Sequence, residues 1–186
     1  MKLPIIGYGN PVLKKIAEPI DPNYPELDVL IENMWETMYN AQGVGLAAPQ
    51  IGLSIRLFLV DSTPVADKEN GEEGIKKVFI NAEILYEDGD DWTYEEGCLS
   101  IPTVRGDVER PESVTIKYCD ENFKEHTETY TGINARVIQH EYDHIDGILF
   151  TELLKPVKKA LIRRKLDNIR KGNVEVDYNM RFAVQK

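Results

Sequence analysis

The stretch His-Glu-Tyr-Asp-His at positions 140–144 constrains the fold and chemistry of this chain more than any other. On an α-helix, residues four positions apart lie on the same face, so His140 and His144 can bind one metal ion. Glu141 lies beside that face and can exchange a proton with a metal-bound water, as in metal-dependent hydrolases. The same pattern also occurs on ordinary solvated helix faces, so the surrounding sequence must decide between the two interpretations.

The residues before this motif predict a helix of about four turns. Gly132 marks its start, and Gly147 suits its end because glycine is favoured just after a helix. One stripe of the helix carries apolar residues and both histidines at spacings of four, three and four: Ile133, Val137, His140 and His144. Ile133 and Val137 therefore lie below the ligands, in a position that suits either the core or the floor of a substrate pocket.

Two histidines leave a metal site incomplete, and few residues can supply a third ligand. In one large group of zinc proteases a third histidine follows, at the position that Phe150 occupies here. In other zinc proteases a glutamate follows about one helix later, but residues 155–172 contain none. The remaining candidates are Cys98, Cys119 and His126.

Two of these candidates suit a structural role. Cys119 ends an alternating stretch that is typical of a strand. His126 lies in the polar stretch 125–130, which is predicted to be the return strand of the same hairpin with its imidazole free in solvent. Cys98 differs because it follows a glycine at the end of an acidic loop, where the sequence allows both a buried free cysteine and a metal ligand.

A third segment, 43–50, favours the metal-ligand interpretation of Cys98. Its sequence, Gly-Val-Gly-Leu-Ala-Ala-Pro-Gln, disfavours a regular helix or strand and lets a backbone approach closely. Segments 43–50, 96–100 and 139–144, in this order and at these separations, resemble the three signature motifs of the peptide deformylases. Agreement of three separate motifs is very unusual by chance.

The resemblance continues outside the motifs. Residues 8–13 resemble the N-terminal turn of that family, and Arg105 and Arg110 fall where arginines follow the cysteine motif in bacterial members. The departures are the polar loop 62–77 and the divergent tail 173–186, and neither touches a motif. We therefore expect a single peptide deformylase domain.

The resemblance implies a ligand set and a reaction. Cys98, His140 and His144 would bind one divalent ion and leave the fourth position to water. Such an ion can lower the pKa of water from about 15.7 to around 7. Glu141 would act as general base and then as general acid while N-formylmethionine of a newly made polypeptide releases formate. The bond that breaks is a formamide C–N bond, so the expected enzyme is a hydrolase and not a peptidase.

The resemblance also implies two donors for the developing oxyanion. The side-chain amide of Gln50 and the backbone N–H of Leu99 would both donate, and each such donor is typically worth about 3 to 4 kcal/mol of barrier. Gln50 alternatively ties the glycine-rich segment to the next strand. Gly45 would let an extended substrate pair its backbone with the enzyme like an added strand.

The methionine side chain is expected to enter a hydrophobic pocket. Its predicted walls are Val44, Ile133 and Val137, and Arg105 is a further predicted substrate contact. Family membership implies Fe²⁺ as the physiological ion, with Ni²⁺ or Co²⁺ also supporting activity. Imidazole and thiolate ligands suit Zn²⁺ as well, and the sequence does not choose among these ions.

The sequence predicts an α+β fold in which short, mostly antiparallel strands pack around the central metal-binding helix. The predicted helices are 25–41, the metal-binding helix from about 132 to the residues before Gly147, and 157–171. The predicted strands are 56–60, 77–81, 84–86, 113–119 and 125–130. The tail 173–186 alternates apolar and polar residues, which is typical of a further strand. All of these elements are expected to share one domain, 1–186.

Composition agrees with one domain in the cytoplasm. The chain has 186 residues, of which 42% are apolar and 29% charged, and a domain of this size buries about 70% of its unfolded surface. No apolar segment approaches the length of a membrane span, and the apolar N-terminus is too short for a signal peptide. Two cysteines make no disulfide framework, and a ligating thiol requires a reducing compartment. We expect no membrane partner and no specific DNA binding.

Basic charge is concentrated in residues 155–172. This segment contains eight lysines and arginines and one acid, Asp167, whereas the whole chain has a net charge of −10. Its apolar residues, Leu161, Ile162, Leu166 and Ile169, predict a docked surface helix whose basic face balances an acidic body. In bacterial relatives the C-terminal helix contacts the ribosome, so the resemblance implies a salt-sensitive ribosome anchor as the alternative.

Two other classes of protein share part of this pattern. A zinc endopeptidase would use Glu141 and both histidines but would not need Cys98. A noncatalytic module stabilised by a metal would need no open metal position and would tolerate Glu141→Gln without loss of activity.

Overall fold

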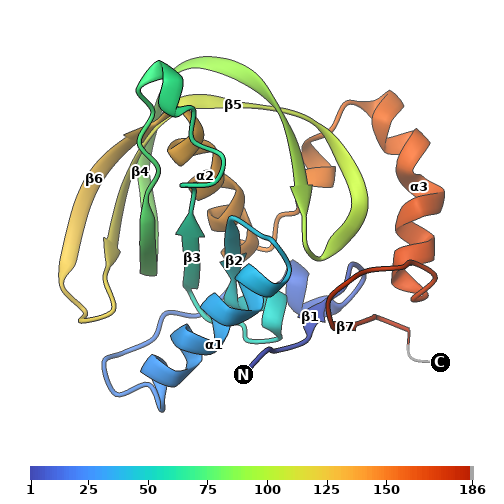
Figure 1. Cartoon of the computed structure of the whole chain (residues 1–186), viewed down its shortest axis with the longest axis horizontal. Helices are drawn as coiled ribbons and strands as arrows, with labels where there is room; N and C mark the ends of the chain where they lie inside the picture. The colour runs from blue at the N-terminus through green and yellow to red at the C-terminus, as the bar shows by residue number, and fades with distance from the viewer. Residues whose placement is uncertain (185–186) are drawn as a thin grey trace.

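The computed structural model describes residues 1–184 and confirms the α+β class (Figure 1). Its helices are α1 (Leu27–Asn40), α2 (Gly132–Ile145) and α3 (Pro156–Arg170). A five-stranded antiparallel sheet has the order β2-β3-β4-β5-β6, and a parallel pair joins β1 to β7. The strands are β1 (Ile5–Ile6), β2 (Gly45–Ala47), β3 (Leu57–Asp61), β4 (Lys76–Cys98), β5 (Ile101–Cys119), β6 (Glu125–Thr131) and β7 (Met180–Arg181). Short 3-10 helices are η1 (Pro11–Lys14), η2 (Ala48–Ile51), η3 (Lys68–Asn70) and η4 (Phe150–Leu153).

Helix α2 lies at the centre of the molecule and carries the histidine motif (Figure 1). It contacts β2, β3, β5 and β6, and nine of its fourteen residues are buried. Ala135 and Ile138 are fully buried in the core cluster that also contains the stacked rings of Phe58 and Phe79. Gly147 follows the helix with a φ of 74°, as its predicted role at the helix end requires. The motif therefore stands on a rigid element packed on several sides.

Helix α1 covers the other part of the sheet. The apolar residues at helical spacing in the predicted helix 25–41 face this core. Leu27, Ile31, Met34 and Met38 are buried in a second core cluster with residues of β2, β3 and β4, and Leu30 packs half-buried against it. This cluster fixes the position of β2, and β2 carries Gly45.

The strands β4 and β5 are much longer than predicted. Residues 77–81 and 84–86 belong to one strand of 23 residues, and β5 has 19 residues. Four register shifts interrupt their pairing, and the distal half of the hairpin swings away from the sheet toward α3 (Figure 1). The acidic stretch before Cys98, predicted as a loop, is therefore extended strand. Its side chains are polar because much of this half of the hairpin faces solvent.

The tail is not the long strand that its alternating pattern predicted. Of its described residues, 173–184, only Met180 and Arg181 pair with another strand, and they pair with Ile5 and Ile6 of β1. The alternating apolar side chains instead contact different neighbours: Val174 packs on a core cluster, and Phe182 lies against Gly7 and Gly172. Residues 185 and 186 of the predicted strand lie outside the described residues.

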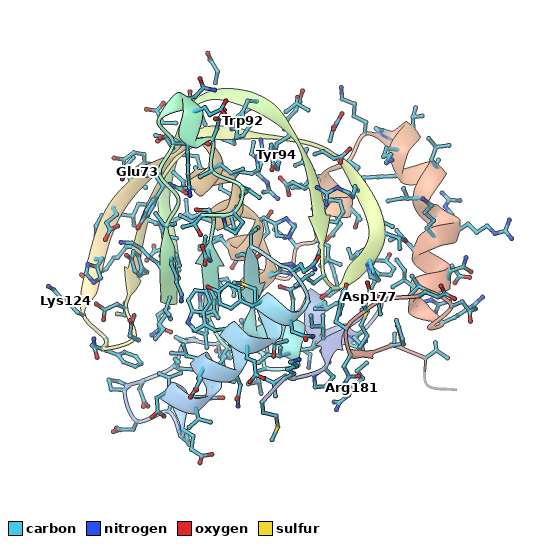
Figure 2. The ribbon with its side chains drawn as sticks, in the orientation of Figure 1. Glu73, Trp92, Tyr94, Lys124, Asp177 and Arg181 are labelled. Carbon is cyan, nitrogen blue, oxygen red and sulfur yellow. The ribbon has the colours of Figure 1, made fainter. Side chains whose placement is uncertain are left out.

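Helix α3 forms the edge of the molecule (Figure 1). Ile162 and Ile169 are buried, but Leu161 is 71% exposed, so the predicted apolar side is narrower than expected. Side chains along the outer face project into solvent (Figure 2). Among residues 1–184, no helix is both long and apolar enough to span a membrane.

Candidate metal centre

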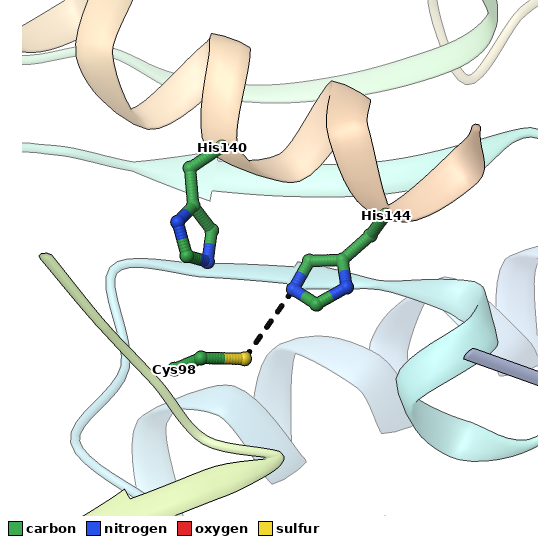
Figure 3. Close-up of side chains that lie close together, drawn as sticks. All are labelled: Cys98, His140 and His144. Atoms are coloured by element: carbon green, nitrogen blue, oxygen red, sulfur yellow. Dashed lines mark hydrogen bonds between the residues drawn. The ribbon is translucent and has the colours of Figure 1, made fainter. Parts of the chain in front are cut away.

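The structure brings together Cys98, His140 and His144 (Figure 3). Cys98 ends β4, and the histidines lie one turn apart on α2. One ligand atom from each side chain lies within 4.8 Å of the others, and Cys98 Sγ is 3.4 Å from His144 Nε2. Within residues 1–184 this is the one group of three metal-ligating side chains. A thiolate and two imidazoles suit a divalent transition metal, so the donor set fits such an ion.

The other two ligand candidates lie elsewhere. Cys119 ends β5 and packs half-buried against the second core cluster. The Nε2 of His126 lies 2.7 Å from Asp120 Oδ2, and the ring stacks on Tyr118 with centroids 5.3 Å apart. The prediction that its imidazole is free in solvent is therefore wrong, because a neighbouring carboxylate and an aromatic ring contact it. Both remain outside the metal centre.

His140 is oriented by a buried carboxylate. Its Nδ1 lies 2.8 Å from Glu96 Oε1, which leaves Nε2 for a metal. Glu96 also accepts hydrogen bonds from Arg110 and Arg136, and Arg110 in turn donates to Asp143 at 2.8 Å. Two arginines and two carboxylates thus form a network that is close to neutral.

The network fixes the charge state of its members. Burial alone would raise the pKa of Glu96, but hydrogen bonds from His140 and Arg110 hold that pKa well below its usual value. Although burial lowers the pKa of Arg110, its bonds to Glu96 raise it on balance. Removing one partner of a buried ion pair typically costs about 3 to 5 kcal/mol, so the network holds His140 firmly in place.

His144 lacks such a support. It is 1% exposed, and its Nδ1 has no hydrogen-bond partner among the described residues. Burial and the neighbouring His140 lower its pKa well below the usual value, so the imidazole stays neutral. A neutral imidazole is the form that binds a metal.

Glu141 is buried beside the three candidate ligands. It is 4% exposed, and its Oε2 has no partner among the described residues. Burial raises the pKa of this carboxyl to about 7. The side chain lies directly on Gly45, where an added Cβ would be 2.7 Å from the Glu141 carboxyl carbon. A glycine is thus required there for the carboxyl to occupy its position.

Gln50 has a defined orientation. Its Oε1 accepts a hydrogen bond from Ala47 N at 3.0 Å, so its Nε2 points the other way. That nitrogen donates toward Cys98 Sγ at 3.4 Å and Ser100 Oγ at 3.2 Å. Gln50 therefore ties η2 to the β4–β5 turn, and its N–H group lies beside the candidate ligand Cys98.

A cavity of about 580 Å³ opens beside these residues. Val44, Gly45, Val137 and Arg105 line it, as do Gln50 and Leu99. Ile133 is not among the lining residues and is 4% exposed in the core cluster that also contains Val137. The remaining predicted pocket residues thus share one cavity with Glu141 and His140.

Sequence reasoning missed several residues around the site. Arg136 is 1% exposed one turn before His140, and its guanidinium lies over the Trp92 ring at 4.6 Å. An arginine on the buried face of α2 was a usable signal, because a buried arginine needs a carboxylate partner. The tail residues Val176, Asp177 and Tyr178 also line the cavity, and no sequence pattern indicated that.

Comparison with known proteins gives consistent results. The family model described as Polypeptide deformylase matches residues 2–160. The peptide deformylase of Christiangramia forsetii is 59% identical over 100% of this chain and 98% of its own length, and that of Flavobacterium johnsoniae is 54% identical over the same shares.

Solved structures agree with the sequence matches. A peptide deformylase from Legionella pneumophila has a TM-score of 0.79 at 39% identity, covering 93% of this chain and 98% of its own. The peptide deformylase of Plasmodium falciparum has a TM-score of 0.81 at 33% identity, covering 90% and 95%.

Proposed function

Since the chain belongs to the polypeptide deformylase family and is thus a hydrolase, we propose that it removes the formyl group from N-formylmethionine of newly made polypeptides. In this proposal Cys98, His140 and His144 bind the metal and Glu141 moves the proton. The observation that carries it is the convergence of the three ligand atoms within 4.8 Å beside a buried carboxyl.

We propose Fe²⁺ as the physiological ion, with Ni²⁺, Co²⁺ or Zn²⁺ able to occupy the site. When bound, such an ion supplies Lewis-acid chemistry and acidifies water. Both cysteines of the chain are free, and a thiolate ligand to a redox-active ion suits the reducing cytoplasm, where we propose that the protein acts.

Glu141 acts as general base and then as general acid. It takes a proton from the attacking water as a bond forms from the water oxygen to the formyl carbon. It then passes that proton to the nitrogen as the C–N bond breaks, so that formate and a free amine leave. The raised pKa of its carboxyl, about 7, suits a group that must both accept and release a proton near neutral pH.

Two N–H groups stabilise the negative charge that develops on the formyl oxygen. The Nε2 of Gln50 lies on the side of the metal ligands, and its Oε1 is held by Ala47 N. The backbone N–H of Leu99 follows Cys98 directly. A donor fixed in advance is typically worth about 3 to 4 kcal/mol because it need not reorganise during the reaction.

The substrate backbone extends β2. This strand lies at the edge of the five-stranded sheet, and Gly45 faces the cavity. An extended peptide can therefore pair with β2 as an added strand. The methionine side chain then lies against Val44 and Val137, with Ile133 supporting Val137 from the core, and Arg105 contacts the peptide beyond the methionine.

Release of formate tests the proposed activity. Protein loaded with Fe²⁺ or Ni²⁺ should release one formate for each free amine from a formyl-Met peptide. The acetylated peptide should react more slowly, because its extra methyl must fit the wall beside the metal. Cleavage of an internal peptide bond without formate release would instead support an endopeptidase.

We predict that Gly45→Ala lowers kcat by about 100-fold with little loss of metal. The new Cβ lies 2.7 Å from the carboxyl carbon of Glu141, so that side chain must move, and a displacement of about 1 Å can cost that much. Steady-state kinetics and metal analysis check it. Combining Gly45→Ala with Glu141→Gln should cost little beyond Glu141→Gln alone, since both act through one carboxyl; additive losses would contradict this route.

We also propose that α3 anchors the protein to the ribosome. Lys159, Arg163 and Arg164 are exposed on this helix, and none forms an ion pair with a described residue. Such free basic groups bind a phosphate backbone in a salt-dependent way.

Reversing these three charges to glutamate should leave turnover of a short formyl-Met peptide unchanged and abolish co-sedimentation with ribosomes at low salt. The matched control reverses three exposed lysines elsewhere, Lys2, Lys68 and Lys124, and should retain binding. Equal co-sedimentation of both variants would contradict the ribosome anchor. It would favour the alternative, in which the basic face of α3 only balances the negative charge of the rest of the chain.

A further inference from the structure

We propose that Tyr178, in the tail, is a positioning residue for the reaction: its hydroxyl holds the carbonyl of Leu99 and so restrains the backbone of the residue whose N–H points at the substrate. The inference rests on the proposed role of Leu99 as a donor. It assigns the divergent tail, which lies beyond the part matched by the family model, to the active site.

The tail passes beside the tip of the β4–β5 hairpin, as Figure 2 shows at the labelled Asp177. Tyr178 lines the cavity, and its hydroxyl donates a hydrogen bond of 2.7 Å to the Leu99 carbonyl. Two residues later Met180 begins the pairing with β1. The β1–β7 pairing therefore holds the backbone beside Tyr178 in place. Its hydroxyl reaches a residue 79 positions away in the sequence.

The turn at Leu99 and Ser100 needs such support. Cys98 pairs with Ile101, so these two residues connect β4 to β5 directly. Two-residue hairpin turns favour positive φ angles, which match the twist of the strands, but neither Leu99 nor Ser100 has one. A register shift beside Cys98 disturbs the ladder further. The conformation of the turn thus depends on contacts from outside the hairpin.

Residues outside the hairpin contact both carbonyl groups of the turn and the Ser100 hydroxyl. The Leu99 carbonyl accepts from Tyr178, and the Ser100 carbonyl accepts from Tyr8 N at 2.9 Å. The Ser100 hydroxyl accepts from Gln50. The Leu99 side chain lies close to Gly43, where an added Cβ would be 2.7 Å from Leu99 Cδ1.

These contacts bracket the Leu99 N–H. On one side the peptide is attached to Cys98, whose sulfur lies among the metal ligands. On the other side Tyr178 fixes the Leu99 carbonyl, which belongs to the next peptide plane, and this limits rotation about the two backbone bonds of Leu99 that join the two planes. Without the hydroxyl, the Leu99 carbonyl would lose its hydrogen bond, and the turn would keep only the Ser100 contacts and the packing of the Leu99 side chain. Tyr178 therefore acts through Leu99 and does not touch the reacting atoms.

Tyr178→Phe tests the role, because it removes the hydroxyl and keeps the ring. We expect kcat for a formyl-Met peptide to fall about 10-fold, a fraction of the 100- to 1,000-fold that loss of a whole donor costs, with KM changed less than about twofold and metal content unchanged. In protein labelled with ¹⁵N-leucine, the Leu99 amide should exchange its hydrogen faster with solvent. Its resonance is identified by its absence in Leu99→Ile.

The matched control is Tyr24→Phe, since Tyr24 is half-buried and its hydroxyl has no hydrogen-bond partner among the described residues. It should retain the kcat of the unaltered protein. Equal kcat in Tyr178→Phe and Tyr24→Phe would overturn the inference, as would a fall in kcat with unchanged exchange at Leu99. Absence of formate release from the unaltered protein would overturn the proposed function itself, and the exchange measurement would still report on the tether.

Discussion

Replacing Cys98 with alanine is expected to abolish both metal binding and formate release. The thiolate is one of the three proposed ligands, and the two histidines that remain come from one helix face. Two imidazoles alone bind a divalent ion weakly and leave its position undefined. Metal analysis after gel filtration and a formate assay on the same sample measure the two losses together. Loss of the metal should also lower the melting temperature, because a bound ion stabilises the folded state.

Cys119→Ala is the matched control for this variant. Cys119 is the other free cysteine, and it packs half-buried at the end of β5. Its replacement should retain both metal and activity. Equal metal content in Cys98→Ala and the unaltered protein would remove Cys98 from the proposed ligand set. It would then favour the alternative function, a zinc endopeptidase.

Glu141→Gln is expected to keep the metal and lower kcat by at least about 100-fold, the lower end of general acid–base contributions. The amide has nearly the same shape but cannot accept the proton. Burial already disfavours the charged form of this carboxyl, as its raised pKa of about 7 indicates. Removing the charge should therefore not destabilise the fold.

The control for this loss is Glu109→Gln, at an exposed position of β5, which should turn over peptide normally. Near-normal kcat in a metal-loaded Glu141→Gln sample would contradict the role of Glu141. So would loss of metal from that variant, because the defect would then have a different origin.

The histidine helix and the first helix followed from sequence because one periodicity governs each. Ile133 and Val137 are buried as predicted, and α1 buries the predicted stripe. Cys98 was separated from Cys119 by its motif context, and the structure brings only Cys98 to the histidines. Local sequence patterns were sufficient to predict a helix when one of its faces packs against a single core cluster.

The long hairpin and the tail could not be predicted in the same way. The distal half of β4 is polar because it faces solvent, so its strand character carries no apolar alternation. The tail does alternate, but Val174, Tyr178 and Phe182 contact three different parts of the molecule. An alternating pattern reports burial of every second side chain and does not report which partner buries it.

The network around Glu96 lay beyond sequence reasoning for a related reason. Glu96, Arg110 and Arg136 come from β4, β5 and α2. Nothing local links them, because a carboxylate and its arginines need only meet in space. The buried position of Arg136 on the helix face was the single usable indication that such a partner existed.

The pairing of β1 with β7 has a consequence for the order in which the molecule is made. Met180 is synthesised long after its partner Ile5. Contacts at such long sequence separation form late, because the loop between them must first be closed. The helix with both histidines can fold while the ribosome still holds the tail. The turn beside Cys98 then gains its hydrogen bond from Tyr178 only after that residue has been synthesised, long after the segment that contains Cys98.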